Sequence, residues 1–222
     1  MIQIENLKKT YPGNPPTEAL KSISFIVKRS EFLAVMGRSG SGKSTFLHQL
    51  GLIDIPTEGK IIIDGIDVLA LSESEKTKFR LEYLGYVFQE YALIPELTAW
   101  ENTYLPASAL RTNHNGYKKH AEEILEIVGL ENRLDHFPHE LSGGEQQRVA
   151  IARAIINNPK IIFADEPTAN LDSVSSKIVL DLFQKLKKEF NQTIVMVTHE
   201  PEDKKYTDRV LWLKDGSIEK IE

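Results

Sequence analysis

Cysteine is absent from all 222 residues, and tryptophan and methionine are scarce, with two and three residues. Without cysteine the chain can form no disulfide, no thiolate metal site and no cysteine nucleophile, which fits a reducing compartment. No apolar run approaches the ~20 residues that span a bilayer, and the N-terminal stretch MIQIENLKKTY lacks the apolar core of a signal peptide. We therefore expect a cytoplasmic protein that does not cross a membrane by itself.

A large excess of charge of one sign is also lacking, since 27 basic against 32 acidic residues give a net charge of −5. General nucleic-acid binders usually present a basic face, so we expect no nucleic-acid partner. The apolar fraction of 41% is normal for a globular protein, and the length allows one large or two small domains. The chain is therefore long enough to bury a sizeable core.

Short apolar or alternating runs, separated by turn-forming residues, dominate the first third of the chain and predict strands there. Between residues 88 and 156 the pattern changes to a helical period. In residues 118–130, for example, four apolar side chains fall on one face. The expected strands cover residues 2–7, 22–27, 32–36 and 60–65, and the shared helix face comprises Ala121, Ile124, Leu125 and Val128.

The last third alternates strand, helix and strand. A buried-looking strand over 161–165 precedes a helix over 173–190 and a second apolar strand over 193–199. Strands this apolar, joined by helices, are typical of a parallel sheet covered on both faces, so the fold class is α/β. The expected buried stripe of the helix consists of Val174, Ile178, Leu182, Phe183 and Leu186.

The stretch MGRSGSGKST follows the strand at 32–36 and precedes a helical segment, and it fits the phosphate-binding pattern GxxxxGK(S/T). Gly37 and Gly42 let backbone N–H groups point at phosphate oxygens, and the helix N-terminus adds positive potential. Lys43 would reach the β- and γ-phosphates, while the Ser44 hydroxyl would ligate Mg²⁺. The alternative, a flexible glycine-serine connector, does not explain the placement between strand and helix.

Two carboxylates follow the strand at 161–165. The carboxyl ends of parallel strands converge on one crevice, so Asp165 can hold Mg²⁺ directly or through water. Glu166 could then polarise the attacking water as a general base. The alternative is that two acidic residues merely end a strand.

A second glycine-containing helix start occurs in LSGGEQQR. Ser142 is expected as an N-cap, with Glu145 completing a capping box. Capping does not explain Gly143 and Gly144, which cost helix stability unless something approaches the backbone closely. Because the loop at 37–45 already surrounds its own nucleotide, this second site would serve another chain, so that a head-to-tail pair encloses two ATP molecules.

Six motifs occur together and in order: GRSGSGKST, VFQ, LSGGEQQR, IIFADEP, ANLD and VTHE. With them the chain resembles the nucleotide-binding subunit of an ATP-binding cassette (ABC) transporter over nearly its whole length. The resemblance implies one domain: a P-loop NTPase core with a mainly parallel sheet and an N-terminal antiparallel β subdomain (1–88 and 156–222), and an inserted α-helical subdomain (89–155).

The resemblance also assigns roles to residues. Tyr11 matches the aromatic residue that stacks on adenine, although a buried or turn tyrosine is the alternative. Gln89 matches the glutamine that touches Mg²⁺ and the attacking water, and His199 the histidine at the γ-phosphate. The complete set is catalytic Glu166, His199 and Gln89; metal-binding Ser44, Gln89 and Asp165; nucleotide-binding Tyr11, Gly37, Arg38, Ser39, Gly40, Ser41, Gly42, Lys43, Ser44 and Thr45; and, from the partner chain, Ser142, Gly143, Gly144, Glu145 and Asp172.

The expected activity is ATP hydrolysis by an ATP-dependent homodimer that drives a separately encoded permease at the inner face of the cell membrane. The chain most resembles the ATPases of lipoprotein-release and macrolide-export systems. Cargo and transport direction depend on the missing permease. Alternatives are a soluble ATPase acting on DNA ends or ribosomes, and a nucleotide-binding regulator without turnover.

Two further features have competing interpretations. Several apolar residues form either an exposed groove for a permease helix or part of the core of the helical insertion. They are Tyr91, Leu93, Ile94, Leu97 and Trp100. His136 and His139 suggest a metal site, but Pro138 interrupts any helix there and no cysteine assists, so we expect none.

Overall fold

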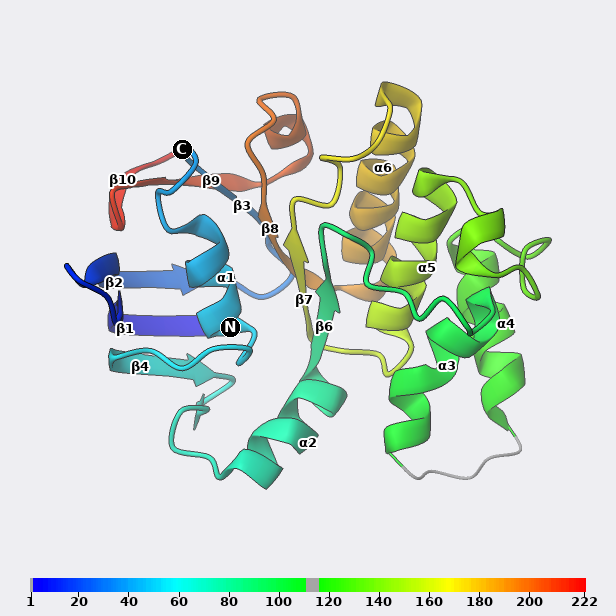
Figure 1. The fold of residues 1–222 in the computed structure, drawn as a ribbon, viewed down its shortest axis with the longest axis horizontal. Helices are drawn as coiled ribbons and strands as arrows, with labels where there is room; N and C mark the ends of the chain where they lie inside the picture. The colour runs from blue at the N-terminus through cyan, green and yellow to red at the C-terminus, as the bar shows by residue number, and fades with distance from the viewer. Residues whose placement is uncertain (1, 111–115) are drawn as a thin grey trace.

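Two β-sheets and a group of helices make up the computed structural model, which describes residues 2–110 and 116–222 (Figure 1). The first sheet has four antiparallel strands in the order β2-β1-β4-β5. Its strands are β1 (Ile2–Tyr11), β2 (Thr17–Val27), β4 (Glu58–Ile63) and β5 (Ile66–Asp67). This sheet lies at the left of Figure 1, away from most of the helices.

The second sheet has six strands in the order β10-β9-β3-β8-β7-β6. Neighbours from β9 to β6 run parallel, and only β10 is antiparallel to its neighbour. The carboxyl ends of β3, β8 and β7 therefore meet at one edge. The bounds are β3 (Phe32–Met36), β6 (Leu84–Val87), β7 (Ile161–Asp165), β8 (Thr193–Val197), β9 (Arg209–Lys214) and β10 (Ser217–Ile221).

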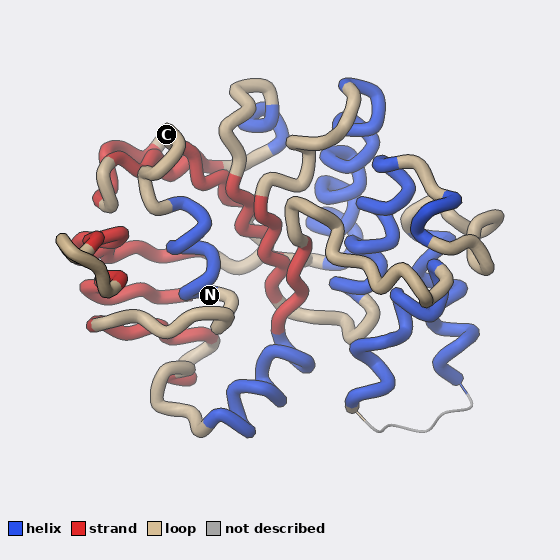
Figure 2. The backbone as a smooth tube through the Cα atoms, in the orientation of Figure 1, coloured by secondary structure: helices blue, strands red, loops and turns tan. Residues whose placement is uncertain are grey.

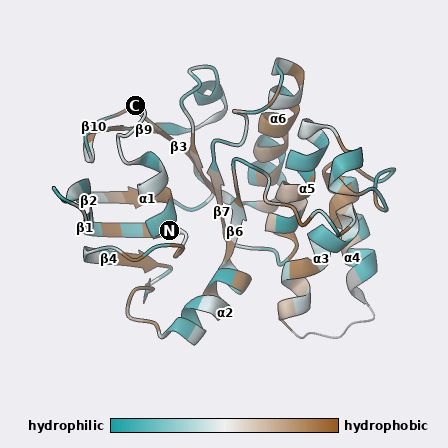
Figure 3. Cartoon of the chain, in the orientation of Figure 1, coloured by the Kyte–Doolittle hydropathy of each residue, from teal (hydrophilic) through white to brown (hydrophobic). Residues whose placement is uncertain are grey.

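Helices cover both faces of this second sheet (Figure 2). In β8, for example, Val195 and Val197 join the core shared with α1 and the first sheet, whereas Ile194 and Met196 face the core of the helical side. Such alternation follows from the two-residue period of a strand, and Figure 3 shows the sheet's hydrophobic stretches. The helices are α1 (Lys43–Leu50), α2 (Glu73–Tyr83), α3 (Ala99–Ala109), α4 (Tyr117–Ile127), α5 (Gly143–Ile155) and α6 (Ser173–Phe190), with 3₁₀ turns at Pro138–Glu140 and Asp203–Tyr206.

Most of the predicted elements are confirmed, and the helix over 173–190 has the expected bounds. Its expected buried stripe is wrong at the N-terminal end, because Val174 is 68% and Ile178 45% exposed. Val179 and Leu180 take their place in the core beside Leu182, Phe183 and Leu186. The predicted apolar face of α4 is buried. Helix α2 and strands β5, β6, β9 and β10 were not predicted.

The helical side contains α3, α4 and α5, gathered at the right of Figure 1. The division at residue 89 and residue 155 stays a prediction, and residues 111–115 within it lie outside the described residues. Of the five apolar residues with two interpretations, Leu93 and Trp100 pack against the core, whereas Ile94 is exposed. In the described part of the chain, no helix combines the length and apolar character needed to cross a bilayer.

Candidate active site

The loop between β3 and α1 is shaped by glycines. Gly40 and Gly42 have φ of 76° and 98°, in the left-handed region that favours glycine. A Cβ on Gly37 would lie 2.2 Å from the Leu213 carbonyl oxygen, which leaves no room for a side chain. Helix α1 then begins without a side-chain cap or an acidic residue in its first turn. Its N-terminal N–H groups are therefore free to bind an anion.

The first sheet reaches this loop through β2. A Cβ on Gly42 would lie 2.5 Å from the carbonyl oxygen of Ala19, and one on Gly216 would lie 2.8 Å from the same oxygen. Hydrogen bonds tie the three segments together: Lys21 N–H donates to Gly216 O at 2.8 Å, and Gly216 N–H donates to Ser41 O at 3.1 Å. The loop is thus packed between both sheets.

Lys43 folds back over the loop and is only 7% exposed. Its ammonium donates to the carbonyl oxygens of Gly37, at 3.1 Å, and Arg38, at 3.2 Å. Within the described residues it makes no ion pair with a carboxylate. Because a buried cation is costly without a counter-charge, the position of Lys43 favours an anionic ligand.

Ser44 and Asp165 come together from α1 and the end of β7. The Ser44 hydroxyl lies 3.1 Å from Asp165 Oδ1, and His48 Nε2 lies 3.4 Å from Asp165 Oδ2. A hydroxyl and a carboxylate are oxygen ligands of the kind Mg²⁺ prefers, so these residues fit that ion. Sequence reasoning missed the contact of His48, although its position one helical turn after Ser44 on α1 could have indicated it.

Glu166 and His199 follow β7 and β8. Glu166 Oε2 lies 3.2 Å from His199 Nδ1, and His199 Nε2 lies 3.2 Å from Glu200 Oε1. The Glu166 side chain is 18% exposed and that of His199 51%. Glu166 has φ of 45°, a strained conformation for a residue other than glycine, and its N–H donates to Val197 O at 2.9 Å.

The phosphate-binding loop, Glu166 and His199 share one open cleft of about 1120 Å³, whereas the predicted residues Ser41 and Asp165 are not among the described residues that line it. The cleft is lined by glycines, hydroxyl groups and the lysine of the loop, and also by the Glu166 carboxylate and the His199 imidazole. Such a set of groups is suited to phosphate chemistry. The predicted residues in its lining are Gly37, Arg38, Ser39, Gly40, Gly42, Lys43, Ser44, Thr45, Glu166 and His199. Thr17, Glu18, Ala19 and Trp212 also line it and were not predicted.

Tyr11 is not among the described residues that line this cleft. Its hydroxyl donates to Asp54 Oδ2 at 2.9 Å, and the Lys9 ammonium lies 4.8 Å from the ring centroid. Burial is the main cause that raises the pKa of Tyr11. The nearby Thr45 side chain lowers this pKa, and the hydrogen bond with Asp54 raises it further.

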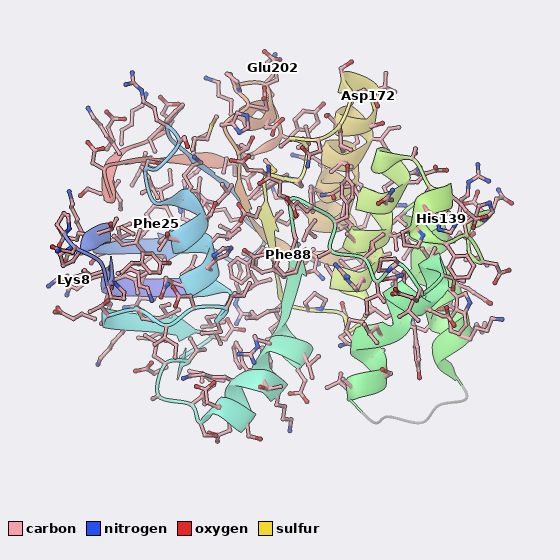
Figure 4. The ribbon with its side chains drawn as sticks, viewed as in Figure 1. Lys8, Phe25, Phe88, His139, Asp172 and Glu202 are labelled. Carbon is pink, nitrogen blue, oxygen red and sulfur yellow. The ribbon has the colours of Figure 1, made fainter. Side chains whose placement is uncertain are left out.

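Gln89 follows β6 and is exposed. Its carbonyl oxygen accepts a hydrogen bond from Asn170 Nδ2 at 3.3 Å, and its side chain is not among the described residues that line the cleft. In Figure 4, Phe88, the residue before it, lies between the sheets and the helical side.

The capping box at the start of α5 is confirmed. Ser142 accepts from Glu145 N–H, and Glu145 accepts from Ser142 N–H at 2.9 Å and from Arg133 Nε at 2.9 Å. Burial alone would raise the pKa of Glu145, but the hydrogen bonds from Ser142 and the nearby Arg133 outweigh it and lower the pKa to about 2. Glu145 is therefore held as a carboxylate.

The two glycines after Ser142 have an explanation within this chain. A Cβ on Gly143 would lie 2.9 Å from the Tyr91 hydroxyl, and one on Gly144 would lie 2.8 Å from Ser175 Oγ. Asp172 caps α6 by accepting from the N–H groups of Val174 and Ser175, both at 2.9 Å (Figure 4). Neither Ser142–Glu145 nor Asp172 is among the described residues that line the cleft.

The histidine pair shows no metal-binding arrangement. Among the described residues, no group of three or more histidine, cysteine, aspartate or glutamate side chains is placed to hold a metal ion. The ring of His139 instead stacks on Phe137, with centroids 5.9 Å apart.

Comparison with known proteins identifies relatives along the whole chain. The ABC transporter family model matches residues 20–169. An uncharacterized ABC transporter ATP-binding protein of Methanocaldococcus jannaschii is 48% identical, with 100% of this chain and 99% of the relative covered. The lipoprotein-releasing system ATP-binding protein LolD of Aquifex aeolicus is 49% identical over 98% of this chain and 96% of the relative.

Two further comparisons define the architecture. The macrolide export ATP-binding/permease protein MacB of Bdellovibrio bacteriovorus is 45% identical, but the chain spans only 34% of that protein. The ATP-binding cassette MJ0796, solved as a dimer in a post-hydrolysis state with ADP and Pi, has a TM-score of 0.93 and 44% identity, with 100% and 98% of the two chains covered. The chain belongs to the ABC transporter family, of which it is an ATP-binding cassette.

Proposed function

We propose that this chain hydrolyses Mg-ATP in the cleft between β2, α1 and the ends of β7 and β8, as a homodimer that drives a separate permease. The observation that carries the proposal is the convergence of the phosphate-binding loop with Glu166 and His199 on one cleft. The loop supplies N–H groups and Lys43 for the β- and γ-phosphates, and Arg38, Ser39, Ser41 and Thr45 complete it.

Ser44 and Asp165 would hold Mg²⁺, with Gln89 as a further ligand. When bound, the ion neutralises negative charge on the β- and γ-phosphates. Glu166 would accept a proton from the attacking water. The oxygen of that water forms a bond to the γ-phosphorus, while the bond between the γ-phosphorus and the oxygen that leaves with ADP breaks. His199, whose Nδ1 lies beside Glu166, would orient the γ-phosphate.

The homodimer would place Ser142, Gly143, Gly144, Glu145 and Asp172 of each chain at the nucleotide of the other. This is supported by their position outside the described lining of their own cleft and by the dimeric state of MJ0796 with ADP and Pi. An N-capped helix start adds positive potential for the γ-phosphate of the partner.

The permease partner is supported by the relatives. LolD is the ATP-binding protein of a lipoprotein-releasing system, and MacB joins an ATP-binding part to a permease in one protein. We propose that the present chain, at the cytoplasmic face of the membrane, works with a separately encoded permease in export or in lipoprotein or peptide extrusion. The exposed Phe88, Ile94 and Leu105 offer apolar contacts for it.

The test uses the wild-type chain and Glu166→Gln. Wild type should release phosphate from Mg-ATP, whereas E166Q should bind ATP, release none and form an ATP-dependent dimer in light scattering. E166Q purified from gently solubilised membranes of its native cells should carry a multi-span membrane protein, identified by mass spectrometry. Bound nucleotide with monomers only would exclude the two-chain site, and a ribosomal or nucleic-acid partner alone would exclude the transport role.

A further inference from the structure

The turn after Gln89 has an unusual backbone. Tyr91 and Ala92 have φ of 58° and 51°, so two successive residues other than glycine adopt the left-handed conformation. L-residues rarely adopt it, and such residues persist only where their surroundings impose the conformation. A specific contact must therefore hold this turn.

Arg153, near the end of α5, makes that contact. Its guanidinium donates from Nη2 to Tyr91 O at 2.8 Å and from Nη1 to Ala92 O at 2.5 Å. Within the described residues it forms no ion pair with a carboxylate, and burial lowers its pKa. The two carbonyl oxygens of the left-handed turn thus stabilise the positive charge of a partly buried guanidinium. Arginine suits this place because its planar guanidinium can donate to two acceptors at once.

The other end of Tyr91 touches the start of α5, since its hydroxyl occupies the space that a Cβ on Gly143 would need. Gly143 and Arg153 are about 15 Å apart along the helix axis at a rise of ~1.5 Å per residue. Helical side chains point back toward the N-terminus, so Arg153 extends toward Gly143. Tyr91 and Arg153 together lie along most of α5.

The same segment is held on two further sides. Asn170, from the loop after β7, donates to the carbonyl of Gln89. Asn102 of α3 is fully buried and pairs with Ile94, accepting from its N–H at 2.8 Å and donating to its carbonyl at 3.1 Å. Besides the Tyr91 hydroxyl at Gly143, it is Arg153 that joins the turn to α5, and it does so through hydrogen bonds.

We propose that Arg153 is a positioning residue for ATP hydrolysis: it locks the Tyr91–Ala92 turn to α5, so that Gln89 and the Ser142–Gly144 turn move as one body. The inference rests on the proposed function. In the homodimer Gln89 serves the nucleotide of its own chain and Ser142–Gly144 that of the partner, so Arg153 connects the two sites. It touches no nucleotide itself.

The test compares Arg153→Lys with Arg80→Lys in the full chain. Arg80, on α2, is the control, because its guanidinium also donates twice, from Nη1 to the Leu52 carbonyl oxygen at 3.1 Å and from Nη2 to Thr77 Oγ1 at 2.9 Å, and none of these three residues belongs to the proposed site. Lysine keeps the charge but cannot form the fork. R153K should bind a fluorescent ATP analogue within about twofold of wild type, while its kcat falls about tenfold and its Hill coefficient for ATP approaches one. R80K should keep wild-type kinetics.

Two readouts separate positioning from simple stabilisation. Amide hydrogen exchange of residues 89–94, measured without nucleotide, should become faster in R153K and not in R80K. Ala92→Gly, which removes the left-handed strain, should restore at least about a third of the kcat lost in R153K.

Three results would overturn the inference. The first is that R153K and R80K have the same kinetics and the same amide exchange. The second is a parallel loss of ATP affinity, kcat and unfolding midpoint in R153K, and the third is an R153K protein that neither folds nor is restored by A92G. If wild type itself releases no phosphate, it is the proposed function that fails, whereas turnover by wild type and R153K alike contradicts only the role of Arg153.

Discussion

Glu166 Oε2 and His199 Nδ1 lie 3.2 Å apart at the ends of two adjacent parallel strands, β7 and β8. The strand register sets this proximity, because Asp165 pairs with Val197 and each catalytic candidate follows shortly after its strand. The backbone N–H of Glu166 donates to Val197 O, which fixes the turn. The proposed base, Glu166, and the imidazole of His199 are thus positioned by the ends of adjacent strands of the sheet.

Replacing His199 by alanine should lower kcat by about 10²-fold, within the range of positioned acid–base and polar groups. Affinity for ATP should change less than about threefold, since the phosphate-binding loop supplies most of the contacts. Phosphate release and equilibrium binding measure the two effects. His139→Ala, an exposed histidine elsewhere, is the control, and an H199A enzyme with normal kcat would exclude the proposed role.

Tyr11→Ala should weaken ATP binding about tenfold if the ring stacks on adenine, because base–aromatic stacking contributes ~1–3 kcal/mol. Tyr11→Phe keeps the ring and loses the hydroxyl with its hydrogen bond to Asp54, so a smaller loss is expected. Equilibrium dialysis with ATP distinguishes the variants. Equal affinity of Y11A and wild type would agree with the position of Tyr11 outside the described cleft lining and contradict stacking.

Gly144→Ala should destabilise the fold by about 1–3 kcal/mol, as expected for overpacking, because the added Cβ would meet Ser175 Oγ and Cβ at 2.8 and 2.9 Å. Ser175→Gly in the same chain should recover part of that loss. Urea unfolding without nucleotide measures both. Gly116→Ala, where a Cβ meets nothing within 4 Å, is the control, and a G144A protein of unchanged stability but impaired ATPase would indicate that the glycine serves the nucleotide instead.

Glu145→Gln should destabilise the chain by about 1 kcal/mol near neutral pH, since the amide keeps the capping hydrogen bond but loses the charge facing Arg133. The folded-state pKa of Glu145, about 2, lies below its ordinary value of 4.5. Its carboxylate therefore stabilises the fold above about pH 4.5, and this contribution is lost as the pH falls toward 2.

Urea unfolding of wild type and E145Q at several pH values checks this. The difference between the two free energies of unfolding should be constant above about pH 5 and shrink steadily below it. A difference that does not change with pH would show that the charge of Glu145 contributes nothing to folding.

The phosphate-binding loop and the strands that carry the carboxylates were predictable because their signals are local. Strand β3 is apolar throughout, β7 is apolar up to its last residue, Asp165, and both have the predicted bounds. The parallel order then brings Ser44 and Asp165 together. The capping box of Ser142 and Glu145 is equally local, since both partners lie within one helical turn.

Other features depend on tertiary packing. Periodicity correctly predicted the buried side chains in the C-terminal half of α6 but not those near its N-terminus. There, Val174 is exposed and Val179 buried because of the elements that pack against the helix. Helix α2 has two buried residues, Lys76 and Phe79, so it lacks an apolar period. The signal that the sequence does contain is the capping box that begins at Ser72. No spacing rule connects Tyr91 to Gly143 or to Arg153.

The Ala19 carbonyl, which lies within van der Waals reach of the positions where Gly42 and Gly216 would carry a Cβ, has a consequence for recombination among related cassettes. The hairpin of β1 and β2 is not an interchangeable part, because its backbone forms one wall of the phosphate-binding loop. A chimaera that imports this hairpin must preserve the path of the chain at Ala19 as well as both glycines. A shift of one residue in the register of β2 would misalign the phosphate-binding loop, although every candidate catalytic residue would still be present in the sequence.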